Sequence, residues 1–335
     1  MSGQAAAPAP QRGGAGSDRR AELVLGAVSV CLLAFIGLMT VTVFVEGWPS
    51  FAHNGYYKWF LPGGDVDTQL RKILDGPTSP AHYYYHLRAW PLLWGTLLTT
   101  FFAVVFALIF AIFASIFIAE LAPRSVRRVL EPVVRLLASV PSVVYGLIGI
   151  LALAPLIEKA FISQERKHSV QYVVQITGEN LTLGIIILMV MILPIMVSLI
   201  MSALSTVPRS WIEGSEALGA NRWRTIRRVS LHAVRPAIVA ATVLATARAL
   251  GEAIMLSLVA GSRAFPVNPL DGFTALFEPV QPLAATIVEN VEGLSTVPFG
   301  HTLYAMAAVL LVSCALLSFA GWAVKQPLKR YGIGV

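Results

Sequence analysis

The sequence predicts an all-α integral membrane protein with six transmembrane helices. Hydrophobic residues make up 56% of the 335 residues and charged residues only 13%, which gives a surface that a water-soluble domain could not solvate. The apolar residues gather in runs of bilayer-spanning length, separated by charged or Gly- and Pro-rich segments. This pattern predicts one helical membrane domain with connecting loops rather than two globular domains.

The chain begins with a polar segment and continues into the first apolar run. Residues 1–20 are rich in Ala, Gly and Pro and show no hydrophobic period, so we expect a disordered cytoplasmic N-terminal tail. The run at residues 23–45 is too long for the core of a signal peptide and lacks a convincing small-residue cleavage site. We therefore expect it to be retained as the first transmembrane helix.

Five further apolar runs are predicted to span the membrane, at residues 91–118, 134–157, 183–204, 236–260 and 302–324. At about 1.5 Å per residue, each is long enough to cross a hydrocarbon core of about 30 Å. The six spans and their loops give one membrane domain over residues 21–325, followed by a cytoplasmic C-terminal tail at residues 326–335. Cys31 and Cys314 both lie inside apolar runs, where they are expected to be small hydrophobic residues rather than disulfide partners or metal ligands.

The distribution of basic residues predicts the orientation. Lys and Arg gather in the second connection, the fourth connection and the tail, at Arg124, Arg127, Arg128, Arg209, Arg222, Arg224, Arg227, Arg228, Arg235, Lys325, Lys329 and Arg330. The fifth connection instead holds Arg263 against four acidic residues, Asp271, Glu278, Glu289 and Glu292. Because cytoplasmic loops carry the excess of basic residues, both termini are predicted to be cytoplasmic. The formal net charge of +7 thus indicates membrane loops rather than a nucleic-acid partner.

Two predicted outer loops are long for a membrane bundle. The first covers residues 46–90 and contains an aromatic cluster at Tyr83, Tyr84 and Tyr85, and the second covers residues 261–301 and contains several prolines. These loops either form a docking platform for an extracytoplasmic partner or simply cap the bundle, and the sequence favours neither.

The fourth connection, at residues 207–235, is predicted to form two helices joined by a tight turn. Ser210 and Glu213 have the spacing of a capping box at the start of the first helix. Gly219 provides the permissive backbone that a helix end and a sharp turn require, and Asn221 is placed to cap the second helix. A short, capped helix at the membrane surface is suited to transmit movement.

This connection resembles the EAA loop of ABC-importer permeases, which marks the cytoplasmic coupling helix that sits in a groove of the ATPase. Glu213, Gly214 and Ser215 stand at the Glu-Ala-Ala positions, and Gly219 stands at the glycine four residues later. The downstream Ile-x-Leu-Pro positions are occupied by Val-Ser-Leu-His at residues 229–232. Gly214 and Ser215 keep the small size of the family residues, so the resemblance implies ATPase docking here, whereas the histidine in place of proline alters the exit of the second helix.

Two further segments resemble the PstC-type permease of the phosphate importer. They are Leu-Leu-Ala-Ser-Val-Pro-Ser-Val-Val-Tyr-Gly-Leu at residues 136–147 and Arg-Ala-Leu-Gly-Glu-Ala at residues 248–253. The resemblance covers residues 20–333, and the basic tail and the long first outer loop favour PstC over the sister permease PstA. It implies a type I ABC importer permease fold and a location in the cell membrane of a prokaryote.

The same resemblance implies a set of partners. They are a PstA-type sister permease in a heterodimer, two PstB-type ATPase subunits that bind ATP and Mg²⁺, and an extracytoplasmic PstS-type phosphate-binding protein. This chain itself is expected to bind no cofactor. It contains no Gly-x-x-x-x-Gly-Lys-Ser/Thr loop, so it is expected to be a transport subunit, not an enzyme, that takes its energy from another polypeptide.

Arg248 and Glu252 lie near the middle of the fifth predicted span, four residues apart and hence on one face of a continuous helix. A charged residue at mid-bilayer costs about 2.5 to 3.5 kcal/mol on insertion scales, so both side chains are expected to be shielded from lipid. They form either a self-neutralising pair that joins helices or a cationic point on an anion pathway. The resemblance favours the pathway, and a guanidinium is well suited to phosphate oxygens.

The third predicted span carries a proline close to hydroxyl groups. Pro141, Ser142 and Tyr145 either form a broken helix that lines the pathway or reflect a proline kink that serves only packing, with equal weight. Pro194 in the fourth span is predicted to be a kink.

Three other functions compete with phosphate uptake. A permease for sulfate or molybdate would show a similar loop, because an arginine in a membrane path indicates only an anion. A secondary transporter without ATP would predict paired inverted repeats or more helices, and neither is visible. A membrane-embedded enzyme acting on a lipid or a phosphate ester would leave the capped cytoplasmic helix pair unexplained.

Overall fold

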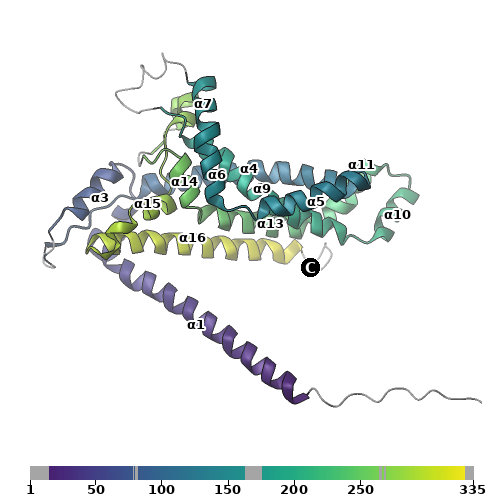
Figure 1. Cartoon of the computed structure of the whole chain (residues 1–335), viewed down its shortest axis with the longest axis horizontal. Helices are drawn as coiled ribbons and strands as arrows, with labels where there is room; N and C mark the ends of the chain where they lie inside the picture. The colour runs from purple at the N-terminus through teal and green to yellow at the C-terminus, as the bar shows by residue number, and fades with distance from the viewer. Residues whose placement is uncertain are drawn as a thin grey trace, which may run out of the picture.

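The computed structural model describes residues 15–77, 79, 82–162, 176–263, 266–267 and 269–328 of the chain. In this part of the chain every regular element is a helix, apart from an isolated β-bridge between Gly261 and Val280. Most of the long helices run along the long axis of the molecule, with α10 at one end and α3 at the other (Figure 1). They are α4 (Trp90–Ile116), α9 (Leu181–Ser205), α13 (Arg235–Leu250) and α16 (Phe299–Leu328).

Five helical segments of the described chain are long and apolar enough to cross a membrane, at Arg19–Asn54, Trp90–Leu121, Ser142–Phe161, Leu181–Ser205 and Phe299–Val324. A sixth is obtained if Arg222–Ala233 and Arg235–Leu250, which are bent by 64° relative to each other, count as one broken span. The chain therefore has the predicted all-α membrane architecture.

Helix α1 (Ala15–Asn54) leans away from the other helices (Figure 1). It begins at Ala15, so residues 15–20 are helical rather than part of the predicted disordered tail, and residues 1–14 of that tail lie outside the described residues. The helix extends into these polar residues because lengthening an existing helix carries no nucleation cost. Its C-terminal part packs closely on α16, since a Cβ atom built at Gly47 would come within 2.9 Å of the backbone nitrogen of Ala305.

The third predicted span, residues 134–157, is not one helix. The amphipathic helix α5 (Arg124–Ala138) ends before Ser139, and α6 (Ser142–Ile148) starts after Pro141 and continues through the π-helix η3 (Gly149–Leu153) into α7 (Ala154–Phe161). Pro141 causes the break, because proline lacks an amide hydrogen and disfavours helical geometry at the preceding residue. The membrane-spanning part is therefore Ser142–Phe161.

The fifth predicted span, residues 236–260, is also interrupted. Helix α13 ends at Leu250, Gly251 follows as its C-cap, and α14 (Ile254–Val259) begins after Ala253. Glycine has a low helix propensity and so favours an interruption at this point. The break lets α14 pack against α6.

The bundle core is built around α9. Its fully buried side chains include Leu183, Leu188, Ile192, Met196 and Ile200. Buried alanines at intervals of four residues on the two helices that pack against it allow close approach of the backbones; they are Ala103, Ala107 and Ala111 on α4 and Ala241, Ala245 and Ala249 on α13. Pro194 is buried within α9, which continues through it as one helix.

The outer loops are folded onto the bundle. The first contains α2 (Tyr56–Trp59) and α3 (Val66–Leu74), and the second contains η5 (Pro269–Phe277), α15 (Leu283–Glu289) and η6 (Val291–Ser295). A separate hydrophobic cluster joins them to the ends of α4 and α16, and includes Trp59, Val66, Leu70, Ile73, Leu92, Leu283, Phe299 and Leu303. The loops thus form a defined surface at the end of the molecule opposite α10 (Figure 1).

Candidate functional site

The predicted helix pair is present in the fourth connection. It consists of α10 (Arg209–Ala217) and α11 (Arg222–Thr225), and α11 continues through the π-helix η4 (Ile226–Ser230) into α12 (Leu231–Ala233). Gly219 has φ 77° and forms the turn, and the side chain of Asn221 accepts a hydrogen bond from the backbone N–H of Arg224 at 2.9 Å. Both predicted roles are confirmed.

The predicted capping box at Ser210 and Glu213 is wrong. Helix α10 starts at Arg209 with Pro208 as its N-cap, and no side chain caps it. Pro208 places Ser210 inside the first turn, where its hydroxyl cannot act as an N-cap.

A side-chain contact holds the two helices together. Oγ of Ser215 lies 3.0 Å from Oγ1 of Thr225, and Thr225 is buried. By contrast, Glu213, Gly214 and Gly219 are exposed, and a Cβ built at either glycine would meet no atom within 4 Å. Of the four predicted coupling residues, Ser215 therefore joins the two helices, and the other three lie on the exposed surface of the pair.

The surface of the helix pair is unusually apolar for a charged segment. Trp211 is 47% exposed, Trp223 53% and Leu218 90%. Exposed tryptophan side chains beside arginines are typical of protein-protein contact surfaces, and exposed apolar patches mark such sites. The pair is thus suited to dock into another protein.

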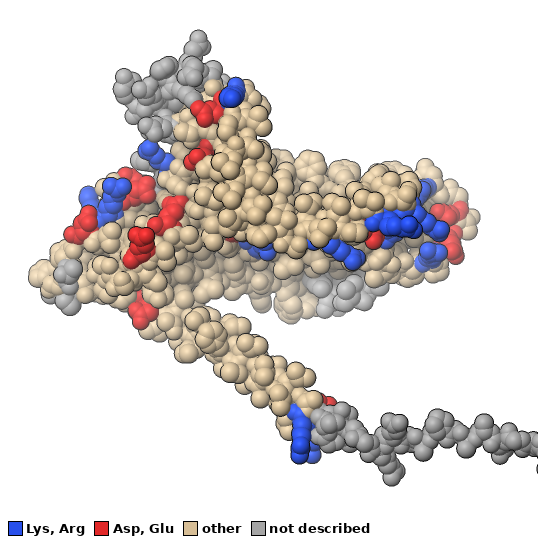
Figure 2. Space-filling model, viewed as in Figure 1, with Lys and Arg blue, Asp and Glu red and all other residues tan. Residues whose placement is uncertain are grey.

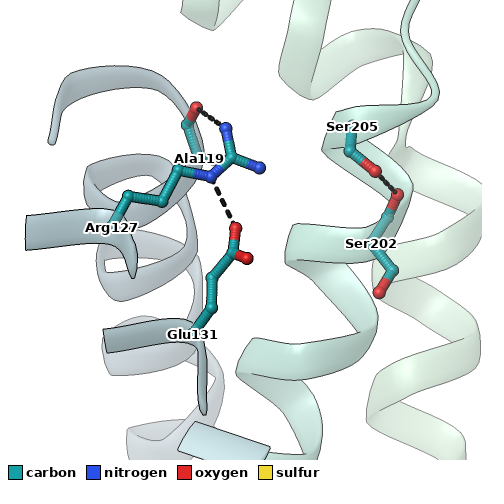
Figure 3. A network of polar contacts seen from close by, with 5 residues as sticks. All are labelled: Ala119, Arg127, Glu131, Ser202 and Ser205. Atoms are coloured by element: carbon teal, nitrogen blue, oxygen red, sulfur yellow. Dashed lines mark hydrogen bonds and ion pairs between the residues drawn. The ribbon is translucent and has the colours of Figure 1, made fainter. Parts of the chain in front are cut away.

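The helix pair is also attached to the end of α4. The last turn of that helix is the π-helix η2 (Phe117–Leu121). A side-chain N–H of Arg222 donates to the carbonyl oxygen of Glu120. Arg127 of α5 donates to the carbonyl oxygen of Ala119 at 3.3 Å and to Glu131 at 2.5 Å (Figure 3). Two arginines thus satisfy carbonyl groups that a helix end leaves without partners.

Lys and Arg side chains gather toward the α10 end of the molecule (Figure 2), where α5 and α11, the helices that carry Arg127 and Arg222, also lie (Figure 1). In the sequence these arginines serve only to predict orientation. Their contacts were missed because they depend on long-range packing, and the only signal in the sequence is a cluster of arginines beside a span.

A second group of candidate residues lies where α6 faces the α13–α14 break. Tyr145 is 7% exposed, and its hydroxyl donates to the carbonyl oxygen of Leu137 at 2.8 Å, which bridges the break between α5 and α6. Ser142 is half-buried at the start of α6. Gly146 allows α14 to approach, because a Cβ there would lie 3.4 Å from Cα of Met255 and 2.9 Å from the Leu258 side chain.

Arg248 and Glu252 are arranged differently from the prediction. Arg248 lies in the last turn of α13, but Glu252 lies beyond its end, so the two do not share the face of one helix. Both residues are described, and they form no ion pair with each other. Helix α14, which follows the break that contains Glu252, packs against α6, which carries Ser142 and Tyr145. Arg248, at the end of α13, and Glu252 thus lie next to the element that contacts α6.

Arg248 is exposed on the single chain, and Glu252 is half-buried. A guanidinium within a membrane-spanning segment has to face an aqueous path or another protein chain rather than lipid. It provides donors that suit an oxyanion. Among the described residues no three His, Cys, Asp or Glu side chains gather as metal ligands.

The chain is similar over most of its length to known transport proteins. Residues 111–324 match the family described as the binding-protein-dependent transport system inner membrane component. The probable ABC transporter permease protein YqgH of Bacillus subtilis is 34% identical over 298 residues, which cover 88% of this chain and 86% of the relative. The phosphate transport system permease protein PstC 1 of Mycobacterium tuberculosis is 30% identical over 321 residues, which cover 91% of this chain and 90% of the relative.

Solved structures share the fold at lower sequence identity. A chain of the inward facing MetNI methionine ABC transporter superposes with a TM-score of 0.53 at 18% identity, covering 71% of this chain and 96% of that one. A chain of a bacterial alginate ABC transporter in complex with its periplasmic protein superposes with a TM-score of 0.54 at 12% identity, covering 95% and 99%. These similarities confirm the predicted type I importer permease fold.

Proposed function

Because the chain belongs to the family of binding-protein-dependent transport system inner membrane components, we propose that it is a PstC-type permease subunit of an ABC importer for inorganic phosphate. It is a multi-pass inner membrane protein and a transport subunit rather than an enzyme. The similarity to PstC 1 over 91% of the chain favours phosphate over other oxyanions.

The observation that carries this function is the exposed and internally braced helix pair α10–α11. Its apolar side chains and open glycines suit it to enter a groove of an ATPase, and the Ser215–Thr225 contact lets it move as one body. Glu213, Gly214, Ser215 and Gly219 are the proposed coupling residues. The ATPase is a separate subunit, which binds ATP and Mg²⁺, whereas this chain binds no cofactor.

The proposed assembly contains a PstA-type sister permease, two PstB-type ATPase subunits and an extracytoplasmic PstS-type phosphate-binding protein. The basic surface around α5 and α11 (Figure 2) supports a cytoplasmic location for α10, with both termini on the same side. The folded outer loops then face the binding protein. The two permeases together enclose the pathway, so that this chain supplies about half of its wall.

The proposed mechanism is alternating access driven from the cytoplasmic end. ATP-dependent closure of the ATPase subunits displaces the helix pair, and Arg222 passes this movement to the end of α4. Arg127 ties the same end to α5, which leads to the break at Pro141 and to Tyr145. Arg248, Tyr145, Ser142 and the nearby Glu252 are the proposed pathway residues, with the guanidinium holding phosphate by charge-assisted hydrogen bonds.

The test is ATPase activity of the reconstituted complex with phosphate-loaded binding protein, with sulfate as the anion control. Phosphate is expected to stimulate hydrolysis, and sulfate is not. Glu213→Ala is expected to abolish stimulation or assembly, whereas Glu216→Ala, which removes another exposed carboxylate on α10, should leave both intact. Arg248→Ala is expected to lower phosphate transport. A complex that neither assembles with an ATPase nor responds to phosphate would overturn the proposal.

A further inference from the structure

A polar cavity of about 500 Å³ lies between the two outer loops. Its wall combines residues of α3 and its N-cap, among them Asp65, Asp67 and Arg71, with Ser262, Gln281 and Glu289 from the second loop. The closest residues of the two segments in the sequence, Leu74 and Ser262, are 188 positions apart. The cavity therefore exists only because both loops fold against each other.

Glu289 is the central acidic group of the cavity. One carboxylate oxygen accepts a hydrogen bond from the Ser262 hydroxyl at 2.6 Å, and the other accepts one from the side-chain amide of Gln281. Burial raises the pKa of Glu289, and the nearby charge of Asp67 acts in the same direction. Ser262 has φ 44°, an uncommon conformation for a residue other than glycine, and such conformations concentrate at binding sites.

Gln281 leaves one polar atom without a partner. Its side chain is 4% exposed, and its Oε1 has no hydrogen-bond donor among the described residues. A buried acceptor of this kind destabilises the folded protein if it stays unsatisfied. Gln281 therefore adds a buried, unpartnered acceptor to the wall of the cavity beside Glu289.

The charges of the cavity indicate which kind of donor fits. Three acidic side chains line it, Asp65, Asp67 and Glu289, against two basic ones, Arg71 and Arg263. Glu289 would repel an anion, so a cation that carries N–H groups fits best. A metal ion is disfavoured, because no group of three metal-ligating side chains is found in the described part of the chain.

We propose that this cavity receives a lysine or arginine side chain of the extracytoplasmic binding protein. The inference rests on the proposed function, and it names the contact that aligns the binding protein with the outer loops. Acidic and basic side chains gather on this end of the molecule, opposite α10 (Figures 1 and 2). An ammonium or guanidinium group in the cavity pairs with the carboxylate of Glu289, next to the unpartnered acceptor of Gln281.

Glu289→Gln is the decisive variant. It removes the negative charge, and the amide oxygen can still accept from Ser262. The new N–H group replaces the oxygen that accepted from Nε2 of Gln281, so the Gln281 amide has to turn over and present Oε1 as the acceptor. The variant is therefore expected to fold. Asp75→Asn serves as a matched control, because Asp75 is exposed at the end of α3 and lies outside the cavity.

The experiment measures the Kd of the phosphate-loaded binding protein for the complete transporter in lipid nanodiscs. Glu289→Gln is expected to raise the Kd about tenfold at low ionic strength, as the loss of one charge-assisted hydrogen bond predicts. High salt should reduce this difference, and Asp75→Asn should not change the Kd. ATP hydrolysis in the absence of binding protein should be the same in all three complexes.

The dependence on pH gives an independent readout. As the pH falls through the raised pKa of Glu289, its carboxylate becomes protonated and docking should weaken. The charged groups around it are Asp65, Asp67, Arg71 and Arg263. The Glu289→Gln complex should lose this step.

The outcomes separate the two proposals. If the binding protein stimulates hydrolysis in the native complex but Glu289→Gln leaves the Kd unchanged, the cavity proposal is wrong and the importer function stands. If the native complex shows no stimulation, both proposals fall. A third outcome would support the direct contact. Glu289→Gln raises the Kd tenfold, and exchanging one lysine or arginine of the binding protein for glutamine then restores the Kd, because neither partner carries an unpaired charge.

Discussion

Oγ of Ser215 and Oγ1 of Thr225 lie 3.0 Å apart, and their contact joins α10 to α11 across the turn at Gly219. Ser215 stands at an alanine position of the EAA loop that the sequence resembles, and here its hydroxyl makes a hydrogen bond. The contact explains how a helix of nine residues and a helix of four can act as one rigid unit.

The Ser215–Thr225 contact is expected to contribute about 0.5 to 1.5 kcal/mol to the stability of the helix pair, as for a typical hydrogen bond. A double-mutant cycle with Ser215→Ala and Thr225→Val measures this coupling through the unfolding midpoint of the purified complex. Ser210→Ala, on the same helix, is the control. Additive effects of the two substitutions would show that the hydroxyl groups do not stabilise each other.

Gly219 is required because of its backbone conformation and not because a side chain there would clash. Its φ of 77° is the left-handed region, yet a Cβ there would touch nothing within 4 Å. Gly219→Ala is therefore expected to cost about 1 to 2 kcal/mol, with Gly219→Asn milder and Gly219→Val worse. Melting temperatures of the three variants test this order, and equal stability of the asparagine and valine variants would contradict it.

Gly214 is expected to behave in the opposite way, because it lies inside α10 with open space around it. Gly214→Ala should stabilise the isolated permease by about 0.5 to 1 kcal/mol through helix propensity. Gly214→Trp should leave its fold intact and yet block the ATPase, if this face enters a groove. Co-purification of the ATPase with each variant is the measurement. Normal recovery of the ATPase with Gly214→Trp would place the docking face elsewhere.

Local features of the sequence predicted local structure well. The turn at Gly219 and the cap at Asn221 depend on residues within one helical turn, so their residue types are sufficient evidence. The capping box at Ser210 was wrong because Pro208 starts the helix earlier than the hydroxyl spacing suggested.

Interruptions of apolar runs were harder to place. The predicted spans continue through Pro141 and through Gly251, because the residues on both sides of each are mostly apolar. The helix is nevertheless interrupted at both places, and α14, which begins after the second interruption, packs against α6, which begins after the first. Hydropathy measures transfer into lipid, whereas the break depends on backbone hydrogen bonding, so the first does not determine the second.

Long-range contacts were not predictable from one sequence. The cavity at Glu289 joins two loops, and Arg222 contacts a carbonyl group 102 residues earlier in the chain. Both depend on how complete helices pack. The sequence shows which residues are charged, and the structure shows which groups they contact.

Arg222 is expected to transmit movement from the helix pair to α4, because its side chain holds the carbonyl oxygen of Glu120 at the end of that helix. Arg222→Gln shortens the side chain and removes the charge, so the helix pair should still dock on the ATPase but move α4 less. Phosphate transported per ATP hydrolysed is expected to fall about fivefold, which corresponds to the loss of one hydrogen bond of ~1 kcal/mol.

Arg224→Gln is the matched control, because Arg224 is an exposed arginine on the same short helix and only its backbone N–H makes a hydrogen bond that the structure describes. It should keep the native ratio of transport to hydrolysis. Proteoliposomes that contain the complete importer allow both rates to be measured on one sample. Equal ratios in the two variants would show that the arginine-carbonyl contact does not carry the movement, and transmission would then have to run through the continuous chain from η4 into α13.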